Sequence, residues 1–273
     1  MQRFTVSERL TLAALPPLAL FAALLVAFVA DRRAEQVHSS AVVGYAETTR
    51  AISDLVHELQ RERGASVGVV ASKRQKPEAV SLLEAQRERT NAALAAYRSL
   101  RTDKRFDAAA RFEATLATAE TDLARIATER KAVDDLTKPV PAVVGWYTGL
   151  IRKLMTSSTE AVKAVDDGRA SLSLFTLQAL SEAKENAGLE RATGNALVSG
   201  GVVEAARYRG FVEALAREND RYGEFAALAE GTEDALIGSL ASAPARAAVE
   251  RLRTILISSL DTGSLDGVTP KDW

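Results

Sequence analysis

Apolar residues recur at helical spacing along most of the chain, and this pattern restricts the possible folds more than any other feature. Alanine, leucine, arginine and glutamate are abundant, and all four favour helices. Aromatic residues make up only 5% of the sequence, and no convincing alternation typical of strands occurs. We therefore predict an all-α fold. The clearest seam, with Arg130 in its one charged position, consists of Phe112, Leu116, Ala119, Leu123, Ile126 and Val133.

Proline, glycine and capping residues divide this pattern into successive helices. We predict continuous helix from Asp31 to about Lys76, before Pro77, and a second helix from about Glu78 to Leu100. These helices are too many for one four-helix bundle, so we predict two bundles that share long helices. The remaining helices are expected from Thr102 or Asp103 through Val133, from Trp146 toward Asp166, from Leu172 to Ser199, along the seam Tyr208, Val212, Leu215, Tyr222 and Ala226, and from Ala243 to Ser259.

The stretch from Leu10 to Ala30 carries no charge and reaches the roughly 20 residues that are needed to span a bilayer. A signal peptide is the alternative, but its apolar core is usually only about 7–15 residues long. We therefore predict an uncleaved transmembrane helix. Its orientation is not decided by charge, because Arg3 and Arg9 on one side are matched by Arg32 and Arg33 on the other.

Charge and composition exclude several classes of function. The formal net charge is −1, from 35 basic and 36 acidic residues spread along the chain, so we predict no nucleic-acid partner. The absence of cysteine excludes disulfides and thiolate zinc sites, and it fits an oxidising compartment. His38 and His57 are isolated from other ligand-type residues, so we predict neither a metal site nor a cofactor.

One stretch, ELQRERGASVGVVAS at residues 58–72, places arginines beside small residues. On a helix, Gln60, Gly64 and Gly68 form a nearly smooth stripe with Arg63 at its border. A neighbouring helix could approach this stripe closely, so Arg63 is a candidate for a ligand contact between helices.

A second stretch, ENAGLERATGNA at residues 185–196, repeats this arrangement around Arg191. Gly188 precedes that arginine by three residues and Asn195 follows it by four, so both share its helical face. We predict that Arg63 and Arg191 converge between helices. Because two buried arginines need a counter-charge, it must come from Glu62 and Glu190, from a bound anion, or from both.

Gly64-Ala65-Ser66-Val67-Gly68 matches the G-x-S-x-G nucleophile elbow of hydrolases. The elbow requires a strand–turn–helix context and a later histidine, whereas this segment is predicted to be helical. The only histidines, His38 and His57, both precede Ser66. We therefore predict no enzymatic activity and no catalytic residue.

The segments LQRERGAS (59–66) and AKENAGLERA (183–192) resemble the two signature stretches of the nitrate- and nitrite-sensing (NIT) domain. The resemblance covers residues 46–260 and implies two up-and-down four-helix bundles that bind nitrate or nitrite. Arg63 and Arg191 would correspond to the family's ligand-binding arginines, and Arg61 is a further candidate. The complete set of candidate ligand-binding residues is Arg63, Arg191, Arg61, Ser66, Gly64, Gly188 and Asn195.

The resemblance also implies a place in the cell, because NIT domains of membrane receptors lie outside the cytoplasmic membrane between two membrane helices. Residues 1–9 would then be cytoplasmic, 10–30 would cross the inner membrane once, and 31–260 would form the periplasmic sensor. The tail, 261–273, would lead to missing cytoplasmic signalling domains of a chemoreceptor or sensor kinase. A free-standing anchored binding protein is the alternative to such a receptor fragment.

Receptors of this kind act as dimers, so we expect homodimerisation through the membrane-proximal helices. Glu35, Val42 and Thr49 lie seven residues apart on one helical face and would cross-link as cysteines. We also expect the helix after the anchor to lie beside the last helix. The alternative function is a helical protein-interaction module that senses a partner protein, with the arginines in structural salt bridges.

Overall fold

The fold consists of helices joined by short connections. The computed structural model describes residues 40–102, 108–200, 203–229, 237–238, 244–265 and 267–268. No strand occurs in these ranges, so the prediction of an all-α fold is confirmed for them. An N-terminal helix, described over residues 40–71, is followed by α2 (Pro77–Thr102), α3 (Ala110–Leu123), α4 (Ile126–Asp134), α5 (Val140–Ala164), α6 (Gly168–Gly200), α7 (Ala205–Leu228) and α9 (Pro244–Thr262).

Prolines mark the starts of three helices, as predicted from the sequence for Pro77. Pro77 begins α2, Pro139 precedes α5, and Pro244 begins α9. Proline suits these positions because the first backbone N–H groups of a helix have no partner within it. The N-terminal helix ends at residue 71, earlier than expected, because Lys73 and Arg74 turn the chain with φ of 49° and 58°.

The seam predicted as one helix between Asp103 and Val133 is two helices, and this part of the prediction was wrong. All six of its apolar residues are buried. However, α3 ends at Leu123, and the Arg125 N–H donates to the Asp122 carbonyl at 2.9 Å, which tightens the chain into a turn before α4. Burial periodicity continues across such a turn, so it could not reveal the break.

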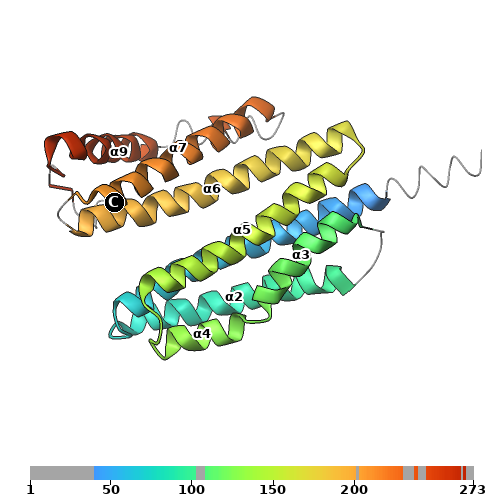
Figure 1. The fold of residues 1–273 in the computed structure, drawn as a ribbon, viewed down its shortest axis with the longest axis horizontal. Helices are drawn as coiled ribbons and strands as arrows, with labels where there is room; N and C mark the ends of the chain where they lie inside the picture. The colour runs from blue at the N-terminus through green and yellow to red at the C-terminus, as the bar shows by residue number, and fades with distance from the viewer. Residues whose placement is uncertain are drawn as a thin grey trace, which may run out of the picture.

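The N-terminal helix and α2 to α5 pack into one layer, which we call the N-terminal layer (Figure 1). A large continuous core joins them. It includes Tyr45, whose ring meets Phe112 edge-on at 5.3 Å between centroids. The fully buried leucines of this core include Leu55, Leu59, Leu116, Leu150 and Leu154.

A second layer, the C-terminal layer, contains α6, α7 and α9 (Figure 1). Its core among the described residues is small and consists of Leu197, Val198, Phe211, Leu215 and Leu256. The long helix α6 belongs to both cores, because its Leu174 joins the first and its Leu197 joins the second. Through α6, the two layers share one continuous helix.

The predicted seam of α7 is rotated relative to the observed one. Only Leu215 of the predicted seam is buried, together with Phe211, Ala214 and Phe225, which the pattern left out. Tyr208 and Val212 pack only at the border of the core. The sequence of α7 offers two nearly equivalent apolar faces. Which of them is buried depends on the helices against which α7 packs.

The last helix does not lie beside the N-terminal helix, in contrast to the prediction. In Figure 1, α6 passes between α9 and the N-terminal helix, which is drawn in blue. The long crossing of α6 therefore separates the two ends of the described fold.

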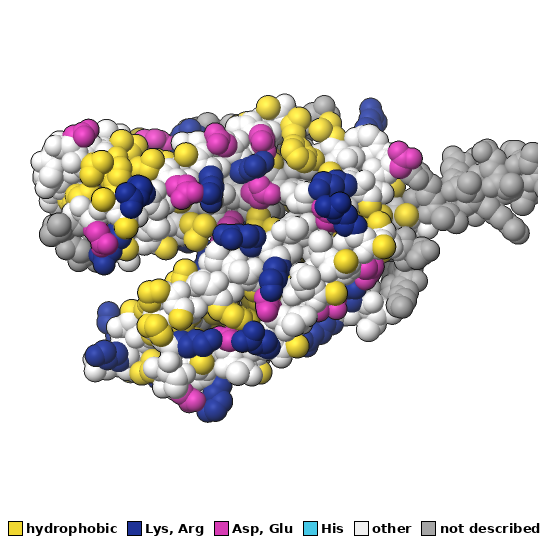
Figure 2. All heavy atoms as spheres, in the orientation of Figure 1, with side chains coloured by type: hydrophobic (Ala, Val, Ile, Leu, Met, Phe, Trp, Pro, Cys, Tyr) yellow, Lys and Arg dark blue, Asp and Glu magenta, His cyan; other side chains and the backbone are white. Residues whose placement is uncertain are grey.

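The predicted transmembrane helix, 10–30, lies outside the described residues. Within the residues that are described, no helix combines the length and apolarity that crossing a bilayer requires. Figure 2 shows a surface that is notched where the two layers diverge and on which basic and acidic side chains alternate across the face.

Candidate functional site

Arg63 is buried between the N-terminal helix, α5 and α6, with only 7% of its surface exposed. Its guanidinium donates to both carboxylate oxygens of Glu185 on α6, from Nη1 to Oε1 at 2.7 Å and from Nη2 to Oε2 at 3.1 Å. Nη1 also donates to Thr148 Oγ1 on α5 at 2.8 Å. Arg63 thus holds a planar pair of oxygens in its fork and ties three helices together.

We call this set of contacts the Arg63 clamp (Gln60, Arg63, Thr148 and Glu185). Gln60 and Gly188 also contribute to its shape. Gln60 Nε2 donates to Glu185 Oε2 at 3.0 Å, one turn before Arg63 on the same helix. A Cβ added to Gly188 would lie 3.4 Å from Arg63 Nη2. Gly188 therefore lies directly against the guanidinium of Arg63, although the sequence pattern had placed it on the face of Arg191.

A cavity of about 290 Å³ lies beside the clamp, between α5, α6 and α7. Thr148 and Glu185 belong both to the clamp and to the wall of this cavity. The Thr148 hydroxyl accepts from Arg63, so its own O–H can still donate to a molecule in the cavity. The rest of the wall is formed by Arg152, Met155, Thr156, Thr159, Glu182, Asn186, Leu189, Arg217, Asp220 and Arg221.

The arginines of the cavity wall differ in their partners. Arg221 pairs with Glu182 at 2.9 Å, and Arg217 pairs with Glu213. Arg152 is exposed on α5, one turn along from Thr148, and its guanidinium has no hydrogen-bond or ion-pair partner among the described residues. Arg152 is therefore the wall cation that is available to an anionic group.

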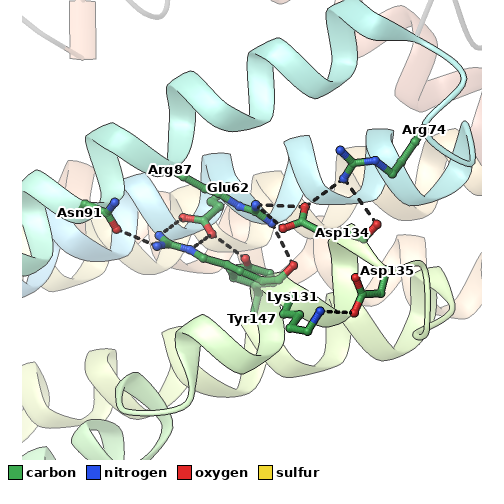
Figure 3. Close-up of polar contacts among 9 residues, drawn as sticks. Glu62, Arg74, Arg87, Asn91, Lys131, Asp134, Asp135 and Tyr147 are labelled. Atoms are coloured by element: carbon green, nitrogen blue, oxygen red, sulfur yellow. Dashed lines mark hydrogen bonds and ion pairs between the residues drawn. The ribbon is translucent and has the colours of Figure 1, made fainter.

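Glu62, one of the two carboxylates considered as a counter-charge for the arginines, belongs to a separate buried network (Figure 3). Arg130 donates to it from Nε at 2.7 Å and from Nη2 at 2.8 Å, and the Tyr147 hydroxyl donates at 2.7 Å. Burial, the largest single effect, raises the pKa of Glu62, but Arg130 together with hydrogen bonds from Thr90 and Tyr147 holds this pKa below its usual range. Glu62 therefore does not neutralise Arg63, because Arg130, the charged residue of the predicted seam, is its partner.

Glu190, the other carboxylate considered as a counter-charge, also has a different partner. Arg253 of α9 donates to Glu190 from Nε at 2.8 Å and to Glu218 of α7 from Nη2 at 2.6 Å. Burial and the Glu190 carboxylate raise the pKa of Glu218 to about 7, against the lowering effect of Arg253. This network joins α6, α7 and α9 and shares no residue with the Arg63 clamp.

The remaining predicted residues are in different environments. Arg191 and Asn195 are exposed on α6, and Arg61 and Gly64 are exposed on the N-terminal helix. Ser66 is fully buried inside that helix, so the G-x-S-x-G match is helical and the hydrolase interpretation has no structural basis. That Arg63 and Arg191 hold one anion together stays a prediction.

Sequence reasoning missed Thr148, Arg152, Glu185 and Arg253. For Glu185 a signal was present, because this acidic residue opens the second arginine stretch, three residues before Gly188. Residues three apart share a helical face, so a partner for Arg63 could have been sought there. Thr148 and Arg152 offered no comparable signal. Among the described residues, no group of acidic or histidine side chains is arranged to hold a metal ion.

Comparison with known protein families assigns the chain to one of them. Residues 54–273 match the family described as nitrate and nitrite sensing, and this range contains the whole Arg63 clamp. The chain belongs to the NIT family. Its family is thus a sensing family rather than an enzyme family.

The fold of this NIT chain is also similar to that of a solved protein, described as the structure of the NasR transcription antiterminator. The TM-score is 0.75 at 23% sequence identity, and the match covers 86% of this chain and 62% of the other. The likeness shows the helical fold alone, since the identity is low, and the match spans only 62% of the length of the other chain. No curated protein in the comparison matches the chain.

Proposed function

We propose that this chain is a sensor that binds nitrate or nitrite at Arg63. The observation that carries the proposal is the buried guanidinium fork of Arg63, which already holds a planar pair of oxygens beside a cavity. Nitrate and nitrite present such a pair of oxygens, and arginine binds planar oxyanions through two parallel hydrogen bonds. Membership of the NIT family supports this ligand class.

The clamp offers the anion more than one donor. Thr148 can donate its hydroxyl from the cavity side, and Gln60 presents an amide N–H₂ beside Arg63. Weakly hydrated monovalent anions lose less on desolvation than sulfate or phosphate, so a largely buried site of this kind favours them. The sensor would therefore distinguish nitrate and nitrite from more strongly hydrated anions.

Binding at the clamp would reach the rest of the molecule through α6. The Arg63 clamp connects the N-terminal helix to this helix, and α6 contributes to the cores of both layers. A ligand that changes this connection shifts an existing equilibrium between positions of α6, rather than creating a new fold. The signal would pass from the clamp along α6 to α7 and α9.

The test is thermal unfolding of the purified chain in sodium nitrate, sodium nitrite and sodium chloride at equal ionic strength. At 100 times Kd, a ligand that binds only the folded chain stabilises it by about 2.7 kcal/mol. We expect stabilisation by nitrate or nitrite but not by chloride, and its loss in Arg63→Ala. Equal melting of the wild-type chain in all three salts up to millimolar concentrations would contradict the proposal.

The second candidate is a protein-interaction module in which Arg63 has only a structural role. The existing ion pair between Arg63 and Glu185 favours this alternative, because a buried pair of this kind needs no ligand. Such a module predicts that Arg63→Ala lowers stability equally in every salt. The melting series in three salts therefore distinguishes the two candidates.

We further propose that the sensor is the periplasmic part of an inner-membrane receptor and acts as a dimer. The uncharged run 10–30 supports the membrane anchor. Thr49 is only 2% exposed, so the face predicted for cross-linking is wrong at this position. Val43, which is 55% exposed, and Arg50 lie seven residues apart on the exposed face, and cysteines placed singly there should cross-link in membranes. Absence of cross-linking at both would exclude this dimer face.

A further inference from the structure

We propose that Glu185 is a built-in competitor for the anion, whose carboxylate fills the fork of Arg63 until nitrate or nitrite replaces it. This inference rests on the proposed function, since it describes how the same site is regulated. It adds a residue that determines affinity and a reason why binding changes the contact between the N-terminal helix and α6.

The position of Glu185 supports competition rather than a separate role. Its carboxylate accepts both guanidinium bonds from Arg63 and lies in the wall of the adjoining cavity. An anion that approaches Arg63 from the cavity therefore meets Glu185 in the place where it has to bind. Because two negative groups cannot share one fork without strong repulsion, the carboxylate has to leave as the anion binds.

The same cavity contains a cation that can receive the displaced carboxylate. Arg152 lies in the wall with Glu185, and its guanidinium has no partner among the described residues. If Glu185 moved away from every cation, a buried carboxylate would be left unpaired at considerable cost. With Glu185 on Arg152 and the anion on Arg63, two positive charges face two negative charges.

The exchange converts binding into a structural change. In the present structure, the 2.7 Å pair between Arg63 and Glu185 is a direct polar connection from the N-terminal helix to α6. After exchange, Arg63 would hold a ligand that is not covalently attached to α6. The position of α6 would then depend on its apolar contacts, on its ion pairs with α7 and α9, and on Arg152 of α5.

The first test is titration calorimetry of sodium nitrate and sodium nitrite with the full chain and with Glu185→Gln. Removal of the competing charge should tighten binding roughly ten- to hundredfold, which is the value of a charge-assisted hydrogen bond expressed as affinity. Glu182→Gln is the matched control, since it removes a negative charge from the same cavity wall without touching Arg63. Glu182→Gln should change the affinity for nitrate clearly less than Glu185→Gln does.

The second test is a double-mutant cycle, which asks whether Arg152 receives the displaced carboxylate of Glu185. Arg152→Met should weaken nitrate binding to the wild-type chain. The same substitution should have little effect in the Glu185→Gln background, because no carboxylate then has to be received. Equal weakening in both backgrounds would show that Arg152 contacts the anion and does not receive Glu185.

The outcomes separate this inference from the proposed function. If the wild-type chain binds nitrate or nitrite through Arg63 but Glu185→Gln binds equally or more weakly, Glu185 positions Arg63 and the inference is overturned. If neither chain binds either anion, the proposed function fails as well. Glu185→Asp keeps the charge but shortens the side chain, and should give an intermediate increase in affinity even if Glu185→Gln does not fold.

Discussion

The two layers of the molecule are held together by different forces. In the N-terminal layer, a continuous apolar core runs through the N-terminal helix and α2 to α5. In the C-terminal layer, the described apolar core is confined to one end, and an arginine with two carboxylates joins α6, α7 and α9. Apolar burial is non-directional and tolerates small shifts, whereas a buried charge network depends on the geometry of a few atoms.

This difference gives the layers different tasks in a sensor. The N-terminal layer supplies a fixed frame that presents Arg63, while the C-terminal layer supplies Glu185 on a helix with fewer apolar anchors. Regions with fewer buried apolar contacts open at lower free energy. A signal at the clamp is therefore expected to move the C-terminal layer relative to the N-terminal one.

The largest effect is expected from the buried network of Arg130, Glu62 and Tyr147 in the N-terminal layer. Arg130→Met leaves Glu62, which is fully buried, without its cation. Removing one partner of a buried ion pair typically costs about 3–5 kcal/mol. We expect a large fall in the urea midpoint. Lys131→Met, which removes an exposed pair with Asp135, is the control and should leave the midpoint almost unchanged.

A matched pair of leucine substitutions compares the two cores directly. Leu150 in α5 and Leu256 in α9 are both fully buried. Leu150→Ala should lower the free energy of unfolding by about 2–5 kcal/mol, because the dense core around it cannot collapse into the gap. Leu256→Ala should instead accelerate amide exchange in α7 and α9 while leaving α3 to α5 protected. Similar loss of protection across both layers after Leu256→Ala would contradict the comparison.

Removal of the charge network of the C-terminal layer should have a local effect. Arg253→Met leaves Glu190 and Glu218 close together without their cation. We expect α9 to lose its amide protection, with no change in the exchange of α3 to α5. Hydrogen exchange by mass spectrometry measures both regions in one sample. Arg251, an exposed arginine on the same helix, provides the control substitution.

The smallest predicted effect is a pH dependence confined to the C-terminal layer. The pKa of Glu218 is raised from 4.5 to about 7 by burial and by Glu190, while Arg253 acts in the opposite direction. Between these two values the folded chain keeps a proton that the unfolded chain releases, so stability falls as pH rises from about 4.5 to 7. Protection factors of α7 and α9 should decrease over this window, and Glu218→Gln should remove the dependence. An unchanged pH profile in Glu218→Gln would assign the effect to another group.

The sequence by itself determined the local features of this protein. Helical periodicity, prolines at helix starts and the small residue at Gly188 depend on neighbours within a few positions, so they could be read without a structure. Arg63 was also identified from its local setting, and the two arginine stretches indicated the NIT family that the comparison then showed.

Only the tertiary structure decided which charges meet. Arg63 pairs with Glu185, Glu62 with Arg130, and Glu190 with Arg253, across separations of 122, 68 and 63 residues. Each acidic residue could have paired with an arginine close to it in sequence, because charge carries no information on which helix faces which. The packing of whole helices fixes their rotation, and this rotation buried Arg63, exposed Arg191 and turned α7 onto Phe211. The partner of the sensing arginine was therefore set by the fold and not by the motif that contains it.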